Sequence, residues 1–166
     1  MAIPKKAAAP MSMETAIRQL LDIEAIKQLK ARYCYCVDAS DWDALEQLWT
    51  EDALCDFGFF GRYEGRAQIM GTLFRQLSAN AATFNAHMVH NPLIDIASDA
   101  AKASWYLTAQ TIIQPHNQAV WVMGIYHDEY RRVNDAWQIS ASKFDFKYYT
   151  PFEEGWAKTS IWQIPT

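Results

Sequence analysis

The sequence predicts an α+β fold in which helices of the N-terminal half cover one face of a curved antiparallel sheet. Two patterns predict it. Apolar residues recur at helical spacing over much of residues 12–78, whereas from residue 85 onward they alternate with polar residues along four long segments. Short turns separate these segments, which favours antiparallel neighbours. A chain of 166 residues is long enough for one domain with a sizeable core.

Three helices and one hairpin are predicted in the N-terminal half. Residues 12–37 contain neither proline nor glycine, and their apolar side chains recur every three or four residues, as in a long amphipathic helix. Ser40 and Asp43 resemble a capping box at the start of a short second helix. The predicted bounds are residues 12–37, 41–49 and 66–78 for the helices and residues 53–64 for the hairpin.

Four long strands are predicted in the C-terminal half. The first alternates apolar and polar residues up to a turn at Ser98 and Asp99, and it carries two of the four histidines. The predicted strands span residues 85–96, 102–114, 119–132 and 136–148. Residues 150–166 show no clear period, and we expect them to pack across the surface or onto another subunit.

Charge and hydropathy argue against nucleic-acid and membrane partners. The formal net charge is −4, and acidic and basic residues are interspersed, so no basic patch could neutralise a phosphate backbone. No apolar run approaches the roughly 18 residues that a membrane-spanning helix needs. The apolar fraction of 51% and the aromatic fraction of 14% suit a subunit interface or an aromatic-lined pocket.

The termini and cysteines predict a cytoplasmic protein. Residues 1–11 are expected to form a flexible leader, because they lack the apolar segment of a signal peptide, and residues 12–166 to form one domain. The odd number of cysteines (Cys34, Cys36 and Cys55) fits reduced thiols.

The histidines argue against a metal site. His87 and His90 are three residues apart on a predicted strand, so they point to opposite faces and cannot readily share a metal. Motifs for a serine nucleophile, a phosphate-binding loop or a dinucleotide are absent, and no cofactor is expected. Both faces of the strand are mixed in polarity, so periodicity alone leaves open which histidine faces inward and whether His87 is structural or functional.

Asp38 is a candidate partner for an inward histidine. It follows an apolar and aromatic run at the end of the predicted first helix. A partly desolvated carboxylate there could hydrogen-bond to an imidazole and fix its tautomer. A capping role at the helix junction is an equally simple explanation. Tyr33 could be an acid in the same pocket or a residue at the edge of the core.

Several segments carry a resemblance to a known family. They are DIEAIKQLKARY at residues 22–33 with the following Val37-Asp38 and Trp42-Asp43, the pattern His87-x-x-x-Asn91-Pro92, ASWYL at residues 103–107, GIYHDEYRR at residues 124–132 and WQI at residues 137–139. Together they resemble the SnoaL-like family within the nuclear transport factor-like superfamily, over about residues 14–156.

The resemblance implies a cone-shaped fold, in which a strongly curved antiparallel sheet is wrapped by the three helices of the N-terminal half around a deep apolar pocket. Members of the family include scytalone dehydratase, a hexachlorocyclohexane dehydrochlorinase and a bile-acid 7α-dehydratase, which are cofactor-free lyases with an Asp–His pair. The positions of that pair correspond to Asp38 and His87. A tyrosine of the bile-acid enzyme corresponds to Tyr33.

Two residues of the bile-acid enzyme have no counterpart in this sequence. The position of its second acid falls at Thr108 or Ala109. The position of its arginine falls at Phe146 or Lys147. The substrate and leaving group of that enzyme are therefore not carried over by the resemblance.

These observations predict a lyase that needs no cofactor. It would remove a proton next to an activating group and expel water or another small leaving group from an apolar cyclic or aromatic small molecule. His87 would be the general base, Asp38 would orient it, and Tyr33 would donate a hydrogen bond to a carbonyl or leaving oxygen. The expected pocket walls are Asn91, Trp42, Phe57, Tyr126 and Phe144.

Three other functions remain compatible with the sequence. An isomerase could use the same dyad and return the proton it abstracts. A carbon–carbon lyase could cleave a phenolic substrate by a retro-aldol step that releases formaldehyde. A non-catalytic protein could bind an apolar ligand in the same cone. Whatever the function, the aromatic content and the family resemblance predict a homo-oligomer, with a trimer favoured over a dimer.

Overall fold

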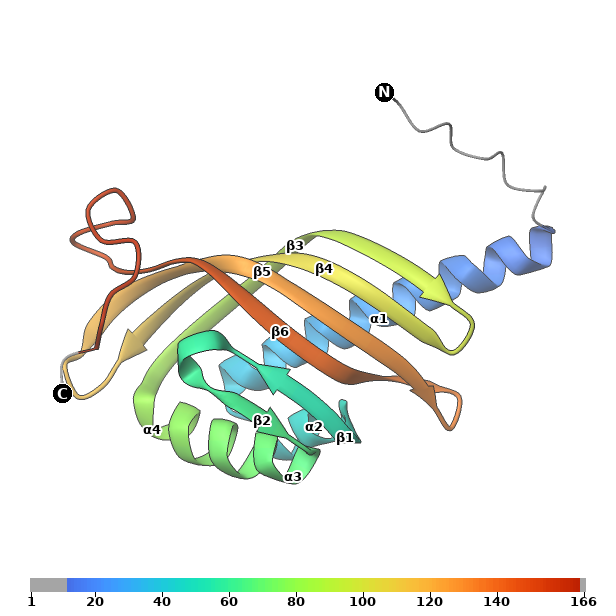
Figure 1. The fold of residues 1–166 in the computed structure, drawn as a ribbon, viewed down its shortest axis with the longest axis horizontal. Helices are drawn as coiled ribbons and strands as arrows, with labels where there is room; N and C mark the ends of the chain where they lie inside the picture. Colours follow the sequence, from blue (N-terminus) through green and yellow to red (C-terminus); the bar gives the residue numbers. More distant parts are fainter. Residues whose placement is uncertain (1–11, 165–166) are drawn as a thin grey trace.

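The computed structural model describes residues 12–164 and consists of a curved six-stranded sheet with helices packed against it (Figure 1). The predicted leader at residues 1–11 lies outside the described residues. Within residues 12–164, we find no helix with the length and apolar character needed to cross a membrane. The prediction of an α+β fold is confirmed.

Helices and short strands come first along the chain, and four long strands follow. The helical elements are α1 (Met13–Ala39), α2 (Trp42–Glu46), the 3₁₀ turn η1 (Gly58–Phe60), α3 (Arg66–Gln68), the π-helical segment η2 (Ile69–Ser78) and α4 (Ala79–Ala81). The strands are β1 (Trp49–Asp56), β2 (Arg62–Glu64), β3 (Ala82–Ala97), β4 (Ala100–Ile113), β5 (Gln118–Val133) and β6 (Ala136–Pro151).

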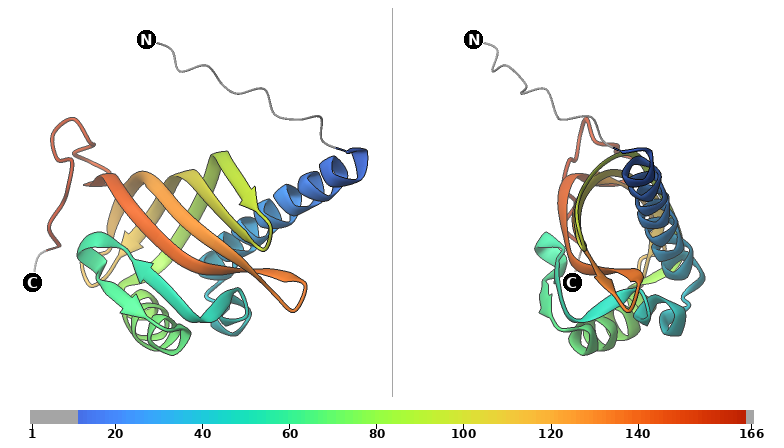
Figure 2. Two further views of the ribbon diagram at one scale, coloured as in Figure 1. Left: turned by 45° about the vertical axis from the view of Figure 1, so that its right-hand side comes forward. Right: turned by 90° about the vertical axis from the view of Figure 1, so that its right-hand side faces the viewer.

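The sheet has the strand order β2-β1-β6-β5-β4-β3 and is curled but not closed (Figure 2). The four long strands pair with their sequence neighbours in antiparallel register, as predicted. The sheet departs from the antiparallel pattern at one place, where β1 pairs with β6 in parallel. This parallel pair arises because α2 and the chain around it return β1 to the edge of β6, where Ile139 donates its N–H to the carbonyl of Leu48.

Helix α1 packs its buried stripe against the sheet and forms one side of the core (Figure 2). The stripe recurs at helical spacing, and its members are Ile26, Leu29, Lys30, Tyr33, Cys34 and Val37. The helix ends where Ser40 adopts a left-handed conformation with φ of 55°. The N–H groups of Ser40 and Asp41 then bond to the carbonyls of Val37 and Cys36 and satisfy two carbonyls that the helix end leaves open.

The second helix is shorter than the sequence predicts and has a different cap. It ends at Glu46, and the chain enters β1 at Trp49. The indole of Trp49 is fully buried in the core. The N-cap is Asp41, whose carboxylate accepts a hydrogen bond from the N–H of Ala44. The predicted capping box of Ser40 and Asp43 does not form, since Ser40 terminates α1 instead.

Strand β3 contains one extra residue relative to its partner. His90 lies opposite Tyr106 and Leu93 lies opposite Ser104, so three steps on β3 match two steps on β4. Asn91 lies in this bulge with φ of 51°. One inserted residue reverses the alternation of side chains, so that His87 faces inward before the bulge and Ile94 packs toward the core after it.

The residues after β6 fold back along its end, as expected for a segment that packs across the surface. Tyr149 donates its N–H to the carbonyl of Ser160, and its carbonyl accepts from the N–H of Trp162. The indole of Trp162 also stacks on the ring of Tyr149, with centroids 6.2 Å apart. The tail therefore supports one of the aromatic side chains that line the interior of the cone.

Candidate functional site

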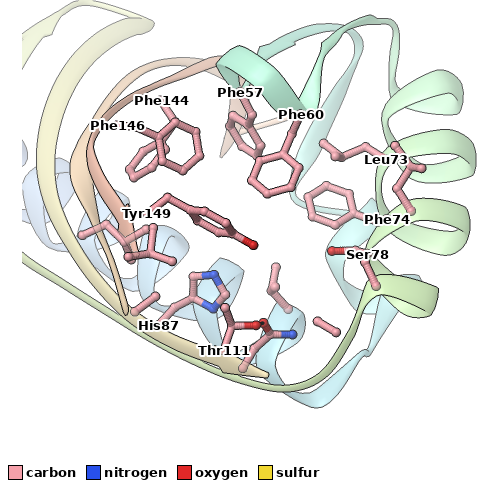
Figure 3. A pocket seen from close by; sticks show the side chains of 18 of the residues that line it. Phe57, Phe60, Leu73, Phe74, Ser78, His87, Thr111, Phe144, Phe146 and Tyr149 are labelled. Atoms are coloured by element: carbon pink, nitrogen blue, oxygen red, sulfur yellow. Dashed lines mark hydrogen bonds between the residues drawn. The ribbon is translucent and has the colours of Figure 1, made fainter. Parts of the chain in front are cut away.

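A pocket opens on the concave side of the sheet, next to the helix that contains η2 (Figure 3). Its cavity volume is about 150 Å³, the size of an engineered protein cavity that stays dry and binds benzene. Aromatic side chains from β6 and from the segment around η1 form one wall, and they are Phe57, Phe60, Phe144, Phe146 and Tyr149. The pocket therefore suits a ligand built around one apolar ring.

His87 and Asp38 form a doubly hydrogen-bonded pair beside this pocket. The ring Nδ1 of His87 lies 2.6 Å from Asp38 Oδ1, and the backbone N–H of His87 donates to Asp38 Oδ2 over 3.0 Å. A carboxylate only accepts hydrogen bonds, so the neutral ring carries its proton on Nδ1 and leaves Nε2 unprotonated. Because His87 lines the pocket, an oriented base adjoins the space for a ligand.

Asp38 is the second residue from the carboxyl end of α1, where the helix dipole contributes partial negative charge. A carboxylate is unfavourable at that end unless a cation faces it. Here its two oxygens are satisfied by Nδ1 and by the backbone N–H of His87. The first helix and the third strand thus supply one half of the dyad each.

Tyr33 lies in the pocket wall beside the dyad. Its side chain is almost fully buried and meets the rings of Trp49, Phe74 and Tyr126 edge to face at about 6 Å. Burial, reinforced by the neighbouring Tyr126, raises the pKa of Tyr33 well above its ordinary value. The phenol therefore stays protonated at neutral pH and can act as a hydrogen-bond donor, but not as a base.

Lys30 and Asp128 form a buried ion pair behind the pocket. The ammonium nitrogen of Lys30 lies 2.9 Å from Asp128 Oδ2, and both side chains are buried. At this distance the two opposite charges attract each other directly. The same nitrogen lies 3.4 Å from the ring centroid of Tyr126, a residue of the pocket wall. The hydroxyls of Tyr130 and Ser142 donate to the carboxylate.

Sequence reasoning missed this pair, although a signal for each member was present. Lys30 is a charged residue on the apolar stripe of the first helix, three residues before Tyr33. Asp128 alternates with Tyr126 and Tyr130 along β5 and so shares their inward face. A charge on the buried side of each element predicts a partner, but the periodicity cannot say that the two charges meet.

Three of the five expected pocket walls line the pocket, and these are Phe57, Tyr126 and Phe144. Asn91 does not, because the bulge in β3 turns it out to solvent, where strict alternation would have placed it beside His87. Trp42 does not line it either. Its indole stacks on the outer side of the pocket residue Phe74, with centroids 5.8 Å apart, and so supports the wall from behind.

A polar group of pocket residues was also missed, and it consists of Ser78, Asn85 and Thr111. Asn85 lies two residues before His87 on β3, so the two share a face, and strand alternation was enough to find it. Thr111 lies directly opposite Asn85 on β4. Ser78 is the last residue of η2, a π-helical segment, and no local sequence pattern predicts that conformation.

The structure offers no assembled metal site among residues 12–164, since no group of three His, Cys, Asp or Glu side chains converges there. The buried thiols are also poor nucleophiles, because burial raises the pKa of Cys34 to about 11 and that of Cys55 further. The titratable pocket residues that can carry chemistry are therefore His87, with Asp38, and the tyrosines.

Solved structures of known proteins share this architecture. LinA superposes with a TM-score of 0.78 over 82% of this chain and 93% of its own, at 21% identity. A scytalone dehydratase-like protein from Novosphingobium aromaticivorans superposes with a TM-score of 0.74 over 81% of this chain and 89% of its own, at 20% identity. At these identities the likeness shows the fold alone, which this chain shares with a nuclear transport factor 2-like protein from Salmonella enterica, at a TM-score of 0.71.

Sequence comparison identifies the family. An uncharacterized protein of Mycobacterium tuberculosis is 26% identical over 125 residues, which are 75% of this chain and 84% of the relative. The model of the SnoaL-like domain matches residues 18–143, and this stretch contains all three residues predicted to be catalytic. The chain belongs to the SnoaL-like family.

Proposed function

We propose that this protein is a cofactor-independent lyase that eliminates water or another small leaving group from an apolar cyclic or aromatic molecule. One observation carries the proposal. His87, held by two hydrogen bonds to Asp38, opens on an aromatic-lined pocket the size of one ring. An oriented base next to an apolar cavity is what the abstraction of a proton from carbon requires.

In the proposed reaction His87 Nε2 takes a proton from a carbon next to an activating group. The electron pair of that C–H bond forms the new double bond, and the leaving group departs from the neighbouring carbon with the electrons of its own bond. Asp38 stabilises the imidazolium, and Tyr33 donates a hydrogen bond to a carbonyl or leaving oxygen. The imidazolium then passes its proton to the departing group or to water, which restores the base.

The similar structures support this class of reaction. LinA is a hexachlorocyclohexane dehydrochlorinase by name, and the protein from Novosphingobium aromaticivorans is named after a dehydratase. Dehydrochlorination and dehydration are both eliminations. The proposal for this chain still depends on its own dyad and pocket, since the fold also serves for binding without catalysis.

Loss of chloride or water from a panel of neutral ring compounds tests the proposal. The panel contains hexachlorocyclohexane and cyclic β-hydroxyketones, and products are identified by mass and by chloride release. We expect elimination products with the wild-type protein and with His90→Ala, which removes a histidine from the outer face of β3. His87→Ala should lower the rate by about 10²- to 10⁴-fold.

The other outcomes of this assay would contradict the proposed mechanism or assign one of the three other functions. Unchanged turnover by His87→Ala would contradict the role of His87 as the general base. A product with the mass of its substrate would assign an isomerase, and released formaldehyde would assign the carbon–carbon lyase. Ligand binding without any product across the whole panel would favour the non-catalytic function.

We further propose that the chain forms a cytoplasmic homotrimer. Met88 and Tyr106 are large apolar side chains on the outward face of the sheet, and they are 46% and 38% exposed in a single chain. All three cysteines are free thiols, which suits a reducing compartment. Light scattering should give three times the chain mass for the wild-type protein and a lower mass for Met88→Arg. A monomeric wild-type protein would contradict this arrangement.

A further inference from the structure

The pocket is polar on one side only. His87 and Thr111 lie opposite the phenylalanine wall, and Ser78 lies on the helix between the two sides (Figure 3). Among the described residues that line the pocket, none is a lysine, arginine, aspartate or glutamate. The nearby ammonium of Lys30 is paired with Asp128 and lies against the ring of Tyr126. An anionic ligand would therefore lose its hydration without gaining a counter-charge, so the pocket favours a neutral one.

Asn85 is the polar residue best placed to recognise such a ligand. It lies on the same face of β3 as His87, two residues away, and directly opposite Thr111 on β4. The hydroxyl of Thr111 lies 2.8 Å from Asn85 Oδ1 and 3.0 Å from the carbonyl oxygen of Phe84, and its single proton is shared between these two acceptors. The carbonyl end of the Asn85 amide is thus engaged.

The other end of this amide is a donor without an acceptor. No hydrogen bond from Asn85 Nδ2 to a protein atom is present among residues 12–164. The residue is half-buried and lines the pocket. An amide N–H₂ in a largely apolar pocket is satisfied when a ligand supplies an oxygen acceptor, and a ligand without one leaves it unpaired.

We propose that Asn85 is the specificity-determining residue of the pocket, and that it binds the carbonyl oxygen of an uncharged, ring-sized substrate next to the carbon that His87 deprotonates. The proposal rests on the proposed function, since it assigns the substrate class of the same site. Removal of a proton next to a carbonyl places negative charge on that oxygen. The Asn85 amide would donate to the oxygen as this charge develops, which makes the residue a determinant of rate as well as of binding.

Binding of three probes of similar size tests the assignment. Acetophenone carries a carbonyl, α-methylstyrene replaces its oxygen with a CH₂ group, and benzoate carries a negative charge. We expect acetophenone to bind about 3- to 10-fold more tightly than α-methylstyrene, the range for one hydrogen bond between neutral groups. Benzoate should bind more weakly than both. Dissociation constants come from ligand-detected NMR titrations.

Three variants distinguish the contribution of Asn85 to this preference from that of the other pocket residues. Asn85→Leu keeps the side-chain size and should make acetophenone and α-methylstyrene bind equally. Thr111→Val removes the hydroxyl that orients the amide and should reduce the preference for acetophenone. Thr108→Val is the matched control, because Thr108 lies on the outward face of the same strand, next to His90. It should leave the preference unchanged.

A measurement on the wild-type protein covers the case in which Asn85→Leu does not fold. The side-chain amide resonances of Asn85 should shift on addition of acetophenone and not on addition of α-methylstyrene. Equal binding of these two probes, tighter binding of benzoate, or no binding of either neutral probe would overturn the proposal. These readouts need no turnover, so a pocket that prefers acetophenone but catalyses nothing would instead contradict the proposed function.

Discussion

Lys30 and Asp128 meet in the interior of the protein, with the ammonium nitrogen 2.9 Å from a carboxylate oxygen and neither side chain more than 1% exposed. This contact ties the middle of α1 to β5, directly behind the pocket residues Tyr33 and Tyr126. A buried charge that loses its partner is costly, whereas a pair removed together is often not. The two residues should therefore be strongly coupled in stability.

We predict that Lys30→Met and Asp128→Asn each lower the free energy of unfolding by about 3–5 kcal/mol. The double variant should lose much less than the sum of the two single losses, because it leaves neither charge buried without its partner. Urea unfolding of the four proteins measures the coupling. Strictly additive losses would show that the pair makes no net ionic contribution.

Gly124 leaves room for the pocket residue Phe144. A Cβ at this position would collide with the ring of Phe144 and lie 2.6 Å from the carbonyl oxygen of Asp145. We expect Gly124→Ala to lower the free energy of unfolding by about 1–3 kcal/mol, because backbone and ring must both move. Gly71→Ala is the control, since an added Cβ in that helix meets nothing within 4 Å. It should raise stability by about 0.5–1 kcal/mol, and equal effects at both glycines would contradict the packing described for β5.

The buried tyrosines predict how stability depends on alkaline pH. Burial raises the pKa values of Tyr33, Tyr126 and Tyr130 well above the ordinary value. Above about pH 10 the unfolded chain releases protons that the folded protein retains, so the free energy of unfolding should fall as pH rises. Absorbance of phenolate at 295 nm measures this titration.

In the native protein, fewer than the eight tyrosines of the sequence should ionise near pH 10. All eight should ionise there in denaturant, and Tyr33→Phe should reduce the difference between the two titrations. Complete ionisation of the native protein near pH 10, without unfolding, would show that these three phenols are accessible to solvent.

Tyr33→Phe also tests the proposed role of this phenol in catalysis. Phenylalanine keeps the edge-to-face contacts with Trp49 and Phe74 and removes only the hydroxyl. Loss of one hydrogen-bond donor to a developing charge should lower kcat by about 10²- to 10³-fold, with little change in KM. Steady-state kinetics on a substrate of the wild-type protein measures both constants. An unchanged kcat would restrict Tyr33 to packing.

Much of the architecture could be predicted from the sequence, because it depends on local patterns. Apolar spacing defines α1, and alternation together with short turns defines the antiparallel strands β3 to β6. The parallel pairing of β1 with β6 could not be predicted in this way. It is a contact between distant segments, and no local pattern records which strand edge a returning chain will meet.

The central pair of the candidate site could be predicted from the sequence. The pairing of Asp38 with His87 was expected from the resemblance to the SnoaL-like family, and the structure places the two side chains in contact. Asn91 was misplaced because alternation assumes a regular strand, and one residue in a left-handed conformation reverses it. The pair of Lys30 and Asp128 depends on tertiary contact alone, which periodicity does not encode.

The central claim is that His87, oriented by Asp38, removes a proton from carbon in a ligand bound in the pocket. Uptake of deuterium from D₂O into the methyl group of acetophenone, followed by ¹H NMR, tests it without knowledge of the natural substrate. We predict exchange with the wild-type protein and with His90→Ala. Exchange should be slower with Asp38→Asn, because an amide cannot accept hydrogen bonds from both the ring and the backbone N–H of His87 through two oxygens. With His87→Ala it should be slower by about 10²- to 10⁴-fold. Exchange at the wild-type rate in His87→Ala, or none in the wild-type protein with the probe bound, would contradict the account.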